Sequence, residues 1–139
     1  MKKKKPVADI MTTDVHTADV DKDTLFDVKD LMLAKGLRHV PVVHGKKLVG
    51  IISKTDIDRL IFSRMFEEEE DADEAVLEML KIEQVMTHKP KAVTKDTTVR
   101  EVAEILAKEE FHALPVVDGD KLVGIVTTTD VIKYMLTQY

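Results

Sequence analysis

The chain has 139 residues, a net charge of −5 at pH 7 and no cysteine. A chain of this length buries enough surface for one compact domain, which we expect to be complete by itself. The lack of cysteine excludes disulfide bonds and thiolate metal sites, and no apolar run approaches the about 18 residues that span a membrane. The acidic balance argues against nucleic-acid binding, which needs clustered positive charge. We therefore expect a cytoplasmic protein that binds neither membranes nor nucleic acids.

One segment of the sequence occurs twice. The run VPVVHGKKLVGIISKTD, which begins at Val40, returns as LPVVDGDKLVGIVTTTD, an offset of 74 positions (130 − 56 for the final aspartates). Upstream, a Met-Thr pair at Met11 recurs at Met86, an offset of 75 (86 − 11), so one residue is missing from the second repeat between these blocks. A period this long exceeds a solenoid unit. It predicts two half-domains that share one core and are related by an approximate twofold axis.

Each repeat begins with the pattern of a short strand and a helix. Residues 18–20 and 92–94 are candidate short strands. In the first repeat, Thr24 precedes apolar residues at helical spacing and a glycine ends them, which predicts a helix of about three turns. In the second repeat, Thr98 and Glu101 have the spacing of a capping box at the start of the equivalent helix.

The second half of each repeat has the pattern of a β-hairpin and a further helix. Residues 40–52 contain two apolar, β-branched runs separated by a glycine turn. In the second repeat, Asp118 and Gly119 are typical of a turn in which both residues have positive φ. Apolar stripes at 57–65 and 131–136 predict the closing helices. The predicted fold class is therefore α/β (α+β), with the order β-α-β-β-α in each repeat and helices covering small mixed sheets.

We expect the first repeat to occupy residues 7–66 and the second residues 82–139, joined by an acidic linker and helix at 67–81. Every residue from Glu67 to Glu74 except Ala72 is acidic. Runs of this kind are usually solvated linkers. The alternative is that these carboxylates recruit a divalent cation.

The motif most informative about function follows each hairpin. It reads SKTD at residues 53–56 and TTTD at residues 127–130, each at a strand-to-helix junction. A helix N-terminus offers unpaired N–H groups and partial positive charge, which suit phosphate, and a carboxylate in the first turn can accept both hydroxyls of a ribose. Alternatively, Ser or Thr followed three residues later by Asp is an ordinary helix cap that needs no ligand. The recurrence of Thr and Asp in both repeats favours a ligand.

The order of motifs is the same in both repeats. A hydrophobic residue precedes Pro-Val-Val, His-Gly or Asp-Gly follows, and Leu-Val-Gly-Ile leads into Ser/Thr-x-Thr-Asp. This order closely resembles the cystathionine β-synthase (CBS) domain, here as a tandem pair called a Bateman module. The resemblance extends from about Val7 to Met135 and includes the Met-Thr pairs. It implies a stand-alone regulatory module that binds adenine nucleotides or related adenosyl compounds in two clefts at the interface of the repeats.

The resemblance also implies roles for individual residues. The aspartates that hold the ribose hydroxyls in such modules match Asp56 and Asp130. The hydroxyl residues near phosphate or sugar match Ser53, Thr55, Thr127 and Thr129. Residues just before the proline often contact phosphate, and they are Arg38 and His39 in the first repeat but His112 and Ala113 in the second. The residues expected to flank the base are Ala18, Val20, Ala92 and Thr94.

The two clefts are not equivalent in this sequence. Because Ala113 cannot donate a hydrogen bond to phosphate, we expect the clefts to differ in affinity, or only one to be occupied. Arg38 is the best candidate for a phosphate contact, since its guanidinium is planar and permanently charged. Family clefts draw groups from both repeats, so the cleft that uses Arg38 is left open.

The sequence gives no support for catalysis. It contains no cysteine nucleophile and no His-Glu-x-x-His or Gly-x-Ser-x-Gly motif, so we expect no enzyme activity. The histidines have no metal-ligand spacing, so we expect neither a structural metal nor a cofactor.

Two functions remain. In the first, the chain is a sensor in which binding of AMP, ADP, ATP or S-adenosylmethionine shifts the arrangement of a dimer, and a partner protein responds. In the second, it is a ligand-free dimerisation or adaptor module whose apolar helices bind another chain. The resemblance implies a homodimer in both cases.

Overall fold

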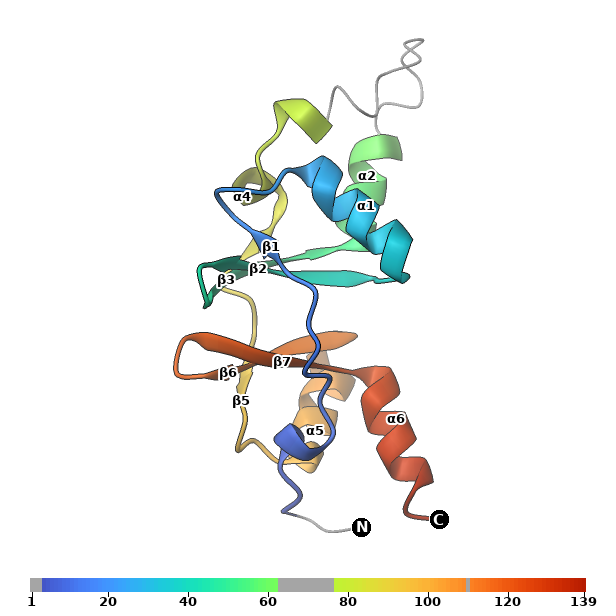
Figure 1. Cartoon of the computed structure of the whole chain (residues 1–139). Coiled ribbons are helices and arrows are strands. Elements are labelled where there is room, and N and C mark those ends of the chain that lie inside the picture. The colour runs from blue at the N-terminus through green and yellow to red at the C-terminus, as the bar shows by residue number, and fades with distance from the viewer. Residues whose placement is uncertain (1–3, 63–76, 110) are drawn as a thin grey trace. The chain divides into compact units, whose positions relative to one another are not determined.

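The computed structural model describes residues 4–62, 77–109 and 111–139 (Figure 1). The chain divides into two compact units, which we call the first-repeat unit (residues 16–90) and the second-repeat unit (residues 1–15 and 91–139). The predicted acidic run lies outside the described residues, and its role stays a prediction. Among the described residues, no helix is long and apolar enough to cross a membrane.

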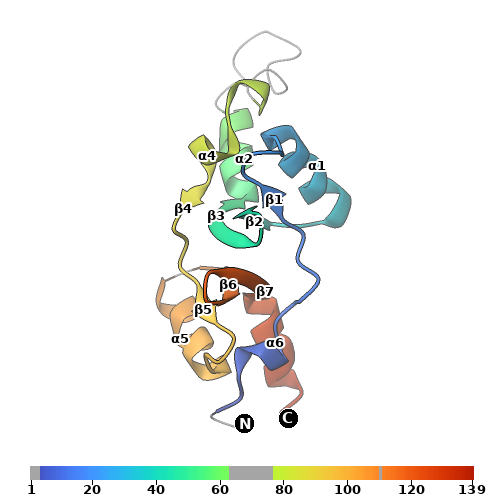
Figure 2. The same ribbon diagram turned by 60° about the vertical axis from the view of Figure 1, so that its left-hand side comes forward.

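The first-repeat unit is a mixed sheet with two helices on one side of its hairpin. Its strands are adjacent in the order β1 (Ala18–Asp19), β2 (His39–His44), β3 (Lys47–Ser53) and β4 (Thr87–His88). β1 runs parallel to β2, and the other pairs are antiparallel. Helices α1 (Leu25–Lys35) and α2 (Lys54–Phe62) lie together on one side of β2 and β3, and α4 (Ile82–Val85) leads into β4 (Figures 1 and 2).

The second-repeat unit repeats this architecture. β5 (Val93–Thr94) runs parallel to β6 (Ala113–Asp118), which pairs antiparallel with β7 (Lys121–Thr127). Helices α5 (Val99–Glu109) and α6 (Thr128–Leu136) lie on one side of this hairpin (Figure 1). The predicted order β-α-β-β-α and the mixed sheet are therefore confirmed in both repeats. The 3-10 helix η1 (Val7–Asp9) belongs to this unit and contributes the buried Val7 to its core.

The two Met-Thr pairs occupy equivalent sheet positions. Thr87 in β4 lies opposite Ile51. Thr12 lies opposite Ile125, the counterpart of Ile51, and the two residues exchange backbone hydrogen bonds of 2.8 and 3.0 Å. The Met-Thr segment that precedes each repeat in the sequence thus completes the unit built from the other repeat.

A glycine accommodates each of these segments. Met86 packs over Gly50 of β3, and Met11 packs over Gly124 of β7. Any side chain at these two positions would collide with the methionine and approach the next carbonyl oxygen. This close approach explains why glycine recurs inside an otherwise β-branched strand.

The strand register locates the residue that the second repeat lacks. Ala18 pairs with Val42 and Val93 pairs with Val116. The first strands are therefore 75 positions apart (93 − 18), whereas the second strands are 74 apart (116 − 42). The missing residue lies in the turn between β5 and α5, and the counterpart of Ala18 is Val93 rather than Ala92.

The helix starts follow the sequence signals. At α5, Glu101 N–H donates to Thr98 Oγ1 (3.1 Å) and Thr98 N–H approaches Glu101 Oε1 (3.4 Å), which is the predicted capping box. At α1, Thr24 and Asp27 form the same box, and Gly36 ends the helix with φ of 64°. These caps fix where each helix begins and ends.

The buried hydrophobic residues form two clusters among the described residues, one in each unit, and the expectation that the repeats share one core stays a prediction. Each hairpin is covered by the two helices of its own repeat, which suffices to bury Val40 in one unit and Val116 in the other. The prediction for the turn is wrong, because Asp118 pairs with Lys121, and of Asp118 and Gly119 only Gly119 has positive φ (67°). The turn therefore has glycine as its first central residue.

Replacing Gly50 with alanine should destabilise the protein. The new Cβ would overlap Met86 Sδ and lie 3.0 Å from the carbonyl oxygen of Thr87. We expect the free energy of unfolding in urea to fall by about 1–3 kcal/mol. In a Met86→Ala background the overlap is gone, so the same substitution should cost less. An equal cost in both backgrounds would contradict the packing described here.

Candidate functional site

Each unit brings several predicted site residues to one strand-to-helix junction. We call residues 53–56, where β3 meets α2, the first junction, and residues 127–130, where β7 meets α6, the second junction. The start of β2 lies beside the first junction and the start of β6 beside the second. The residues just before the proline and the residues of the Ser/Thr-x-Thr-Asp motif lie at opposite ends of each hairpin in the sequence. Strand pairing therefore makes them neighbours within one unit.

At the first junction, backbone pairing brings in the residues before the proline. His39 lies opposite Ser53 at the end of the β2–β3 ladder. Lys54 N–H donates to the carbonyl oxygen of Arg38 at 2.7 Å. Arg38 is exposed, and its backbone lies beside the first turn of α2.

The second junction has the same backbone arrangement. Ala113 lies opposite Thr127, and Thr128 N–H donates to the carbonyl oxygen of His112 at 3.0 Å. His112 is exposed, and Ala113 is buried. His112 thus occupies the backbone position that Arg38 occupies at the first junction.

Both aspartates cap their own helices. Asp56 N–H donates to Ser53 Oγ (3.1 Å), and Ser53 N–H donates to Asp56 Oδ2 (2.9 Å). Thr127 and Asp130 make the same pair of bonds at the same distances. The capping arrangement considered from the sequence is therefore present at both junctions.

The caps leave binding groups free. No described residue donates to Oδ1 of Asp56 or Asp130, and both aspartates are only half-buried. Within the described part of the chain, the N–H groups of Thr55 and Thr129 also have no acceptor. Each junction therefore offers one carboxylate oxygen and one N–H group at a helix N-terminus, where an anion is favoured.

The residues expected to flank the base lie at the other end of each sheet. Ala18 pairs with Val42, three residues along β2 from His39, which is about 10 Å at the rise of a strand. Ala18 is buried in the core, and Val20 N–H donates to the carbonyl oxygen of Val43. Within this unit, Ala18 and Val20 therefore do not join the first junction.

The second repeat shows the same separation. Thr94 pairs with Val117, whereas the second junction lies at the other end of β6. The residue equivalent to Val20 is Lys95, whose N–H donates to the carbonyl oxygen of Val117, and Ala92 lies before the strand. A composite cleft that takes one set of residues from each repeat, as the family resemblance implies, stays a prediction.

The junctions differ in charge. The first has two basic residues, because Lys54 begins α2 beside Arg38. The Nζ of Lys54 pairs with Asp58 Oδ2 at 2.8 Å. At the second junction, Thr128 takes the place of Lys54 and its hydroxyl lies 3.4 Å from the carbonyl oxygen of His112. Lys54 was not among the predicted site residues. The difference between SKTD in the first repeat and TTTD in the second is the feature of the sequence that indicates it.

A hydrogen-bonded turn holds the chain after β1. Asp19 accepts hydrogen bonds from the N–H groups of Asp21 (2.9 Å) and Lys22 (3.1 Å), and Asp23 accepts one from Asp19 N–H (2.7 Å). The N–H of Asp21 stabilises the ionised carboxylate and lowers the pKa of Asp19 below its ordinary value of 3.8. This turn fixes the position of Val20.

Among the described residues, no group of three or more His, Asp or Glu side chains could hold a metal ion.

The cap at the second junction should contribute measurably to stability. Thr127→Ala removes the hydroxyl that accepts from Asp130 N–H, so we expect a loss of about 0.5–2 kcal/mol in unfolding free energy. Thr129→Ala is the matched control, because Thr129 is exposed and makes no side-chain hydrogen bond with any described residue. Equal losses in urea denaturation would contradict the assigned cap.

The Asp19 turn predicts a dependence of stability on pH. A pKa that is lower in the folded state gives stability that is present above the unfolded value of about 4 and is lost as the pH falls through the folded value. Asp19→Asn should therefore be less stable than wild type at pH 7, and the difference should shrink below pH 4. Urea denaturation from pH 7 to pH 3, with the exposed Asp14→Asn as control, measures it. A difference that grows in acid would refute the assignment.

Both halves of the chain match one known protein family. The family model described as the CBS domain matches residues 7–63 and again residues 82–137. An uncharacterised protein of Methanocaldococcus jannaschii is 32% identical over 130 residues, which are 92% of this chain and 46% of that protein. The chain spans less than half the length of the curated relatives it matches most strongly.

Solved structures agree in fold. The crystal structure of CBSX2 in complex with AMP has a TM-score of 0.80 at 26% identity, covering 96% of this chain and 98% of that one. The CBS domain pair of protein MJ0100, in complex with 5′-methylthioadenosine and S-adenosyl-L-methionine, has a TM-score of 0.78 at 26% identity, with the same coverage. With the family model matched by both repeats and the fold shared over almost its whole length, this chain belongs to the CBS domain family and carries the domain as a tandem pair.

Proposed function

We propose that the chain is a non-catalytic regulatory module that binds an adenine nucleotide or adenosyl compound at its two junctions. The candidate ligands are AMP, ADP, ATP and S-adenosylmethionine. In this proposal, Asp56 and Asp130 bind ribose hydroxyls while they continue to cap their helices. The hydroxyls and N–H groups of the first turn face phosphate or sugar.

The observation that carries the proposal is the carboxylate oxygen, Oδ1 of Asp56 and of Asp130, that the cap does not use. An ordinary cap needs only the carboxylate oxygen that accepts the backbone N–H, and at both junctions the other oxygen has no donor in the described residues. A pair of ribose hydroxyls supplies donors to that oxygen. The bound adenosyl compounds in the related structures of CBSX2 and protein MJ0100 support this chemistry.

A helix N-terminus alone cannot supply the binding free energy that a nucleotide site needs. A terminus contributes about 0.3–1 kcal/mol to binding of an anion, whereas micromolar affinity corresponds to about 8 kcal/mol. Burial of the base and a cation must supply the rest. Arg38 and Lys54 provide cationic side chains at the first junction, and His112 provides an imidazole at the second. We therefore expect the first junction to favour ligands with more phosphates.

Regulation would follow from a change in self-association. We propose that ligand binding favours one arrangement of a homodimer, and that a partner protein responds to the difference. The shift can be no larger than the ratio of the ligand's affinities for the two arrangements.

An adaptor without a ligand is the second candidate. The observation that favours it is the exposed apolar surface of α6, where Ile132, Met135 and Leu136 are 50%, 39% and 68% exposed. A surface of this kind is typical of protein contacts. The two candidates differ in whether an adenosyl compound binds at all.

Calorimetric titration with AMP, ADP, ATP and S-adenosylmethionine tests the proposal. We expect at least one ligand to bind with micromolar affinity. Asp56→Asn and Asp130→Asn should each weaken binding at one junction by tenfold or more, since a neutral amide is a weaker acceptor than a carboxylate. The fold should persist, because asparagine still caps a helix.

Asp120→Asn is the matched control for the loss of one negative charge. Asp120 is exposed in the β6–β7 turn, at the other end of β7 from the second junction. A protein whose titrations show no heat with any of the four ligands belongs to the adaptor class. Binding that survives unchanged in both aspartate variants would leave the carboxylates with a capping role only.

A further inference from the structure

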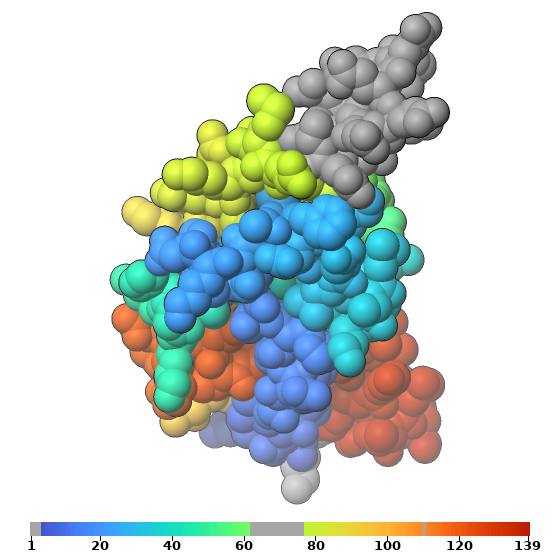
Figure 3. Space-filling model, turned by 45° about the horizontal axis from the view of Figure 1, so that its top comes forward, coloured from blue at the N-terminus to red at the C-terminus, as the bar shows by residue number. Residues whose placement is uncertain are grey.

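Each unit holds the tip of its hairpin to the loop that follows its first strand. In the first-repeat unit, Nδ1 of His44 at the tip lies 2.8 Å from Oδ2 of Asp21 in the loop, and we call this pair the first clasp. In the second-repeat unit, Nζ of Lys95 lies 3.2 Å from Oδ2 of Asp118, and we call this pair the second clasp. Figure 3 shows the hairpin tip of the first repeat, in teal, against the blue loop at the surface.

The two clasps have opposite polarity. At the offset of 74, His44 corresponds to Asp118 (44 + 74), so the tip carries the basic partner in the first repeat and the acidic partner in the second. The strand register makes Lys95 the counterpart of Val20, so the loop partner lies one residue earlier in the second repeat. Either polarity holds the tip to the loop. The basic group is therefore what distinguishes the clasps, an imidazole in one and an amine in the other.

An imidazole makes the first clasp sensitive to pH. A histidine side chain changes charge between pH 5 and 8, whereas lysine and carboxylate side chains ordinarily do not. An ionised carboxylate only accepts hydrogen bonds, so Nδ1 of His44 carries the hydrogen. A neutral ring meets this condition in one tautomer, whereas a protonated ring always meets it and adds an ion pair. The clasp is therefore tighter at pH 6, and this extra stability is lost as the pH rises.

The other charges around His44 leave this pairing in place. Asp19 and Asp23 accept backbone hydrogen bonds within the loop, and the N–H of Gly45 at the tip also faces Asp19. Asp21 is thus the carboxylate that the described loop leaves available to the ring. The remaining charged residues of the loop and the tip form no ion pair with any described residue, and they are Lys22, Lys46 and Lys47.

We propose that the first clasp is a pH-sensitive device, in which proton uptake by His44 fixes the loop after β1 and raises ligand affinity at the site that Val20 borders. The loop carries Val20, whose N–H donates to the carbonyl oxygen of Val43 at 2.9 Å, next to the tip. A loop that is already ordered loses less entropy when a ligand binds. Val20 is one of the residues expected to flank the base, so the step from the clasp to affinity rests on the proposed function.

Exposure limits the size of the effect. The side chains of His44 and Asp21 are 67% and 65% exposed, so solvent screens their interaction. Exposed ion pairs change an equilibrium by about fivefold at most. We therefore expect a graded adjustment of about two- to fivefold between pH 8 and pH 6, rather than an all-or-none change.

A double-mutant cycle tests the first clasp without any ligand. His44→Gln, Asp21→Asn and the double variant are unfolded in urea at pH 6 and at pH 8. We expect the coupling between the two residues to change the folding equilibrium constant about two- to fivefold more at pH 6 than at pH 8. The matched cycle with Lys95→Gln and Asp118→Asn should give the same coupling at both pH values. A coupling between His44 and Asp21 that does not depend on pH overturns the proposal.

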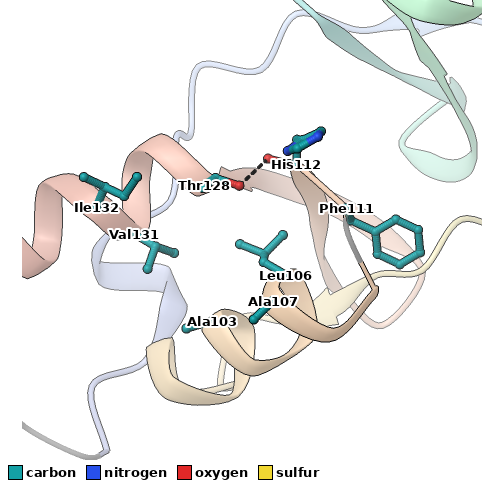
Figure 4. A pocket seen from close by; sticks show the side chains of 8 residues that line it. All are labelled: Ala103, Leu106, Ala107, Phe111, His112, Thr128, Val131 and Ile132. Atoms are coloured by element: carbon teal, nitrogen blue, oxygen red, sulfur yellow. Dashed lines mark hydrogen bonds between the residues drawn. The ribbon is translucent and has the colours of Figure 1, made fainter.

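Loss of a different imidazole is the control for general effects of histidine. His112 is exposed at one end of an apolar hollow lined by residues of α5 and α6, beside Thr128 (Figure 4). It forms no ion pair with any described residue. His112→Gln should therefore keep the pH dependence of wild-type stability, whereas His44→Gln should reduce it. Equal reductions in the two variants would also overturn the proposal.

Ligand titration tests the link to function. The probe is 5′-methylthioadenosine, because it has no phosphate that itself takes up a proton near pH 6. We expect the wild type to bind it about two- to fivefold more tightly at pH 6 than at pH 8, and His44→Gln to bind it equally at both. Equal wild-type affinities together with a pH-dependent cycle reject the link to the ligand and overturn the proposal. Absence of binding by every adenosyl compound rejects the proposed function, while the cycle still decides whether the clasp responds to pH.

Discussion

The reciprocal pair of hydrogen bonds at each strand-to-helix junction is the interaction on which the remaining structure depends. It joins the last residue of a strand, Ser53 or Thr127, to the aspartate in the first turn of the next helix. It starts the helix directly after the strand, and the helix then packs against its own hairpin. Because the bond pair uses only one carboxylate oxygen, the same aspartate can fold the unit and bind a ligand. Stability and binding are therefore compatible at this position, and the capping interpretation does not compete with the functional one.

The two repeats share this scaffold and differ around it. The strands, caps and Met-Thr segments correspond almost residue by residue. The differences lie beside the junctions, where Arg38 and Lys54 of the first repeat correspond to His112 and Thr128 of the second. Duplication thus preserves the parts that determine folding and allows the parts that contact other molecules to diverge. Under the proposed function, this difference in charge would let the two repeats prefer ligands with different numbers of phosphates.

The sequence predicted the local structure well, because caps and turns leave short-range signals. Thr24 and Thr98 begin helices as expected, and the doubled motif led to the family that the matches confirm. The predictions that failed concern pairing between residues that are far apart in the sequence. The counterpart of Ala18 is Val93, because strand register and not sequence alignment determines the position of the missing residue.

The prediction for the turn failed for a related reason. The Asp-Gly signal identified a hairpin but not which residues are central, since that depends on where the ladder ends. Within the candidate site, the residues of each junction come together, whereas Ala18 and Val20 lie elsewhere in the same unit.

The central claim is that Asp56 and Asp130 bind ribose hydroxyls with the oxygen that their caps leave free. The most direct measurement compares AMP with 2′,3′-dideoxy-AMP by calorimetry, in the wild-type protein and in the variant with both aspartates replaced by asparagine. The account predicts that loss of the hydroxyls weakens binding to the wild type at least tenfold and has much less effect in the variant. Equal affinity of the wild type for both nucleotides would contradict it.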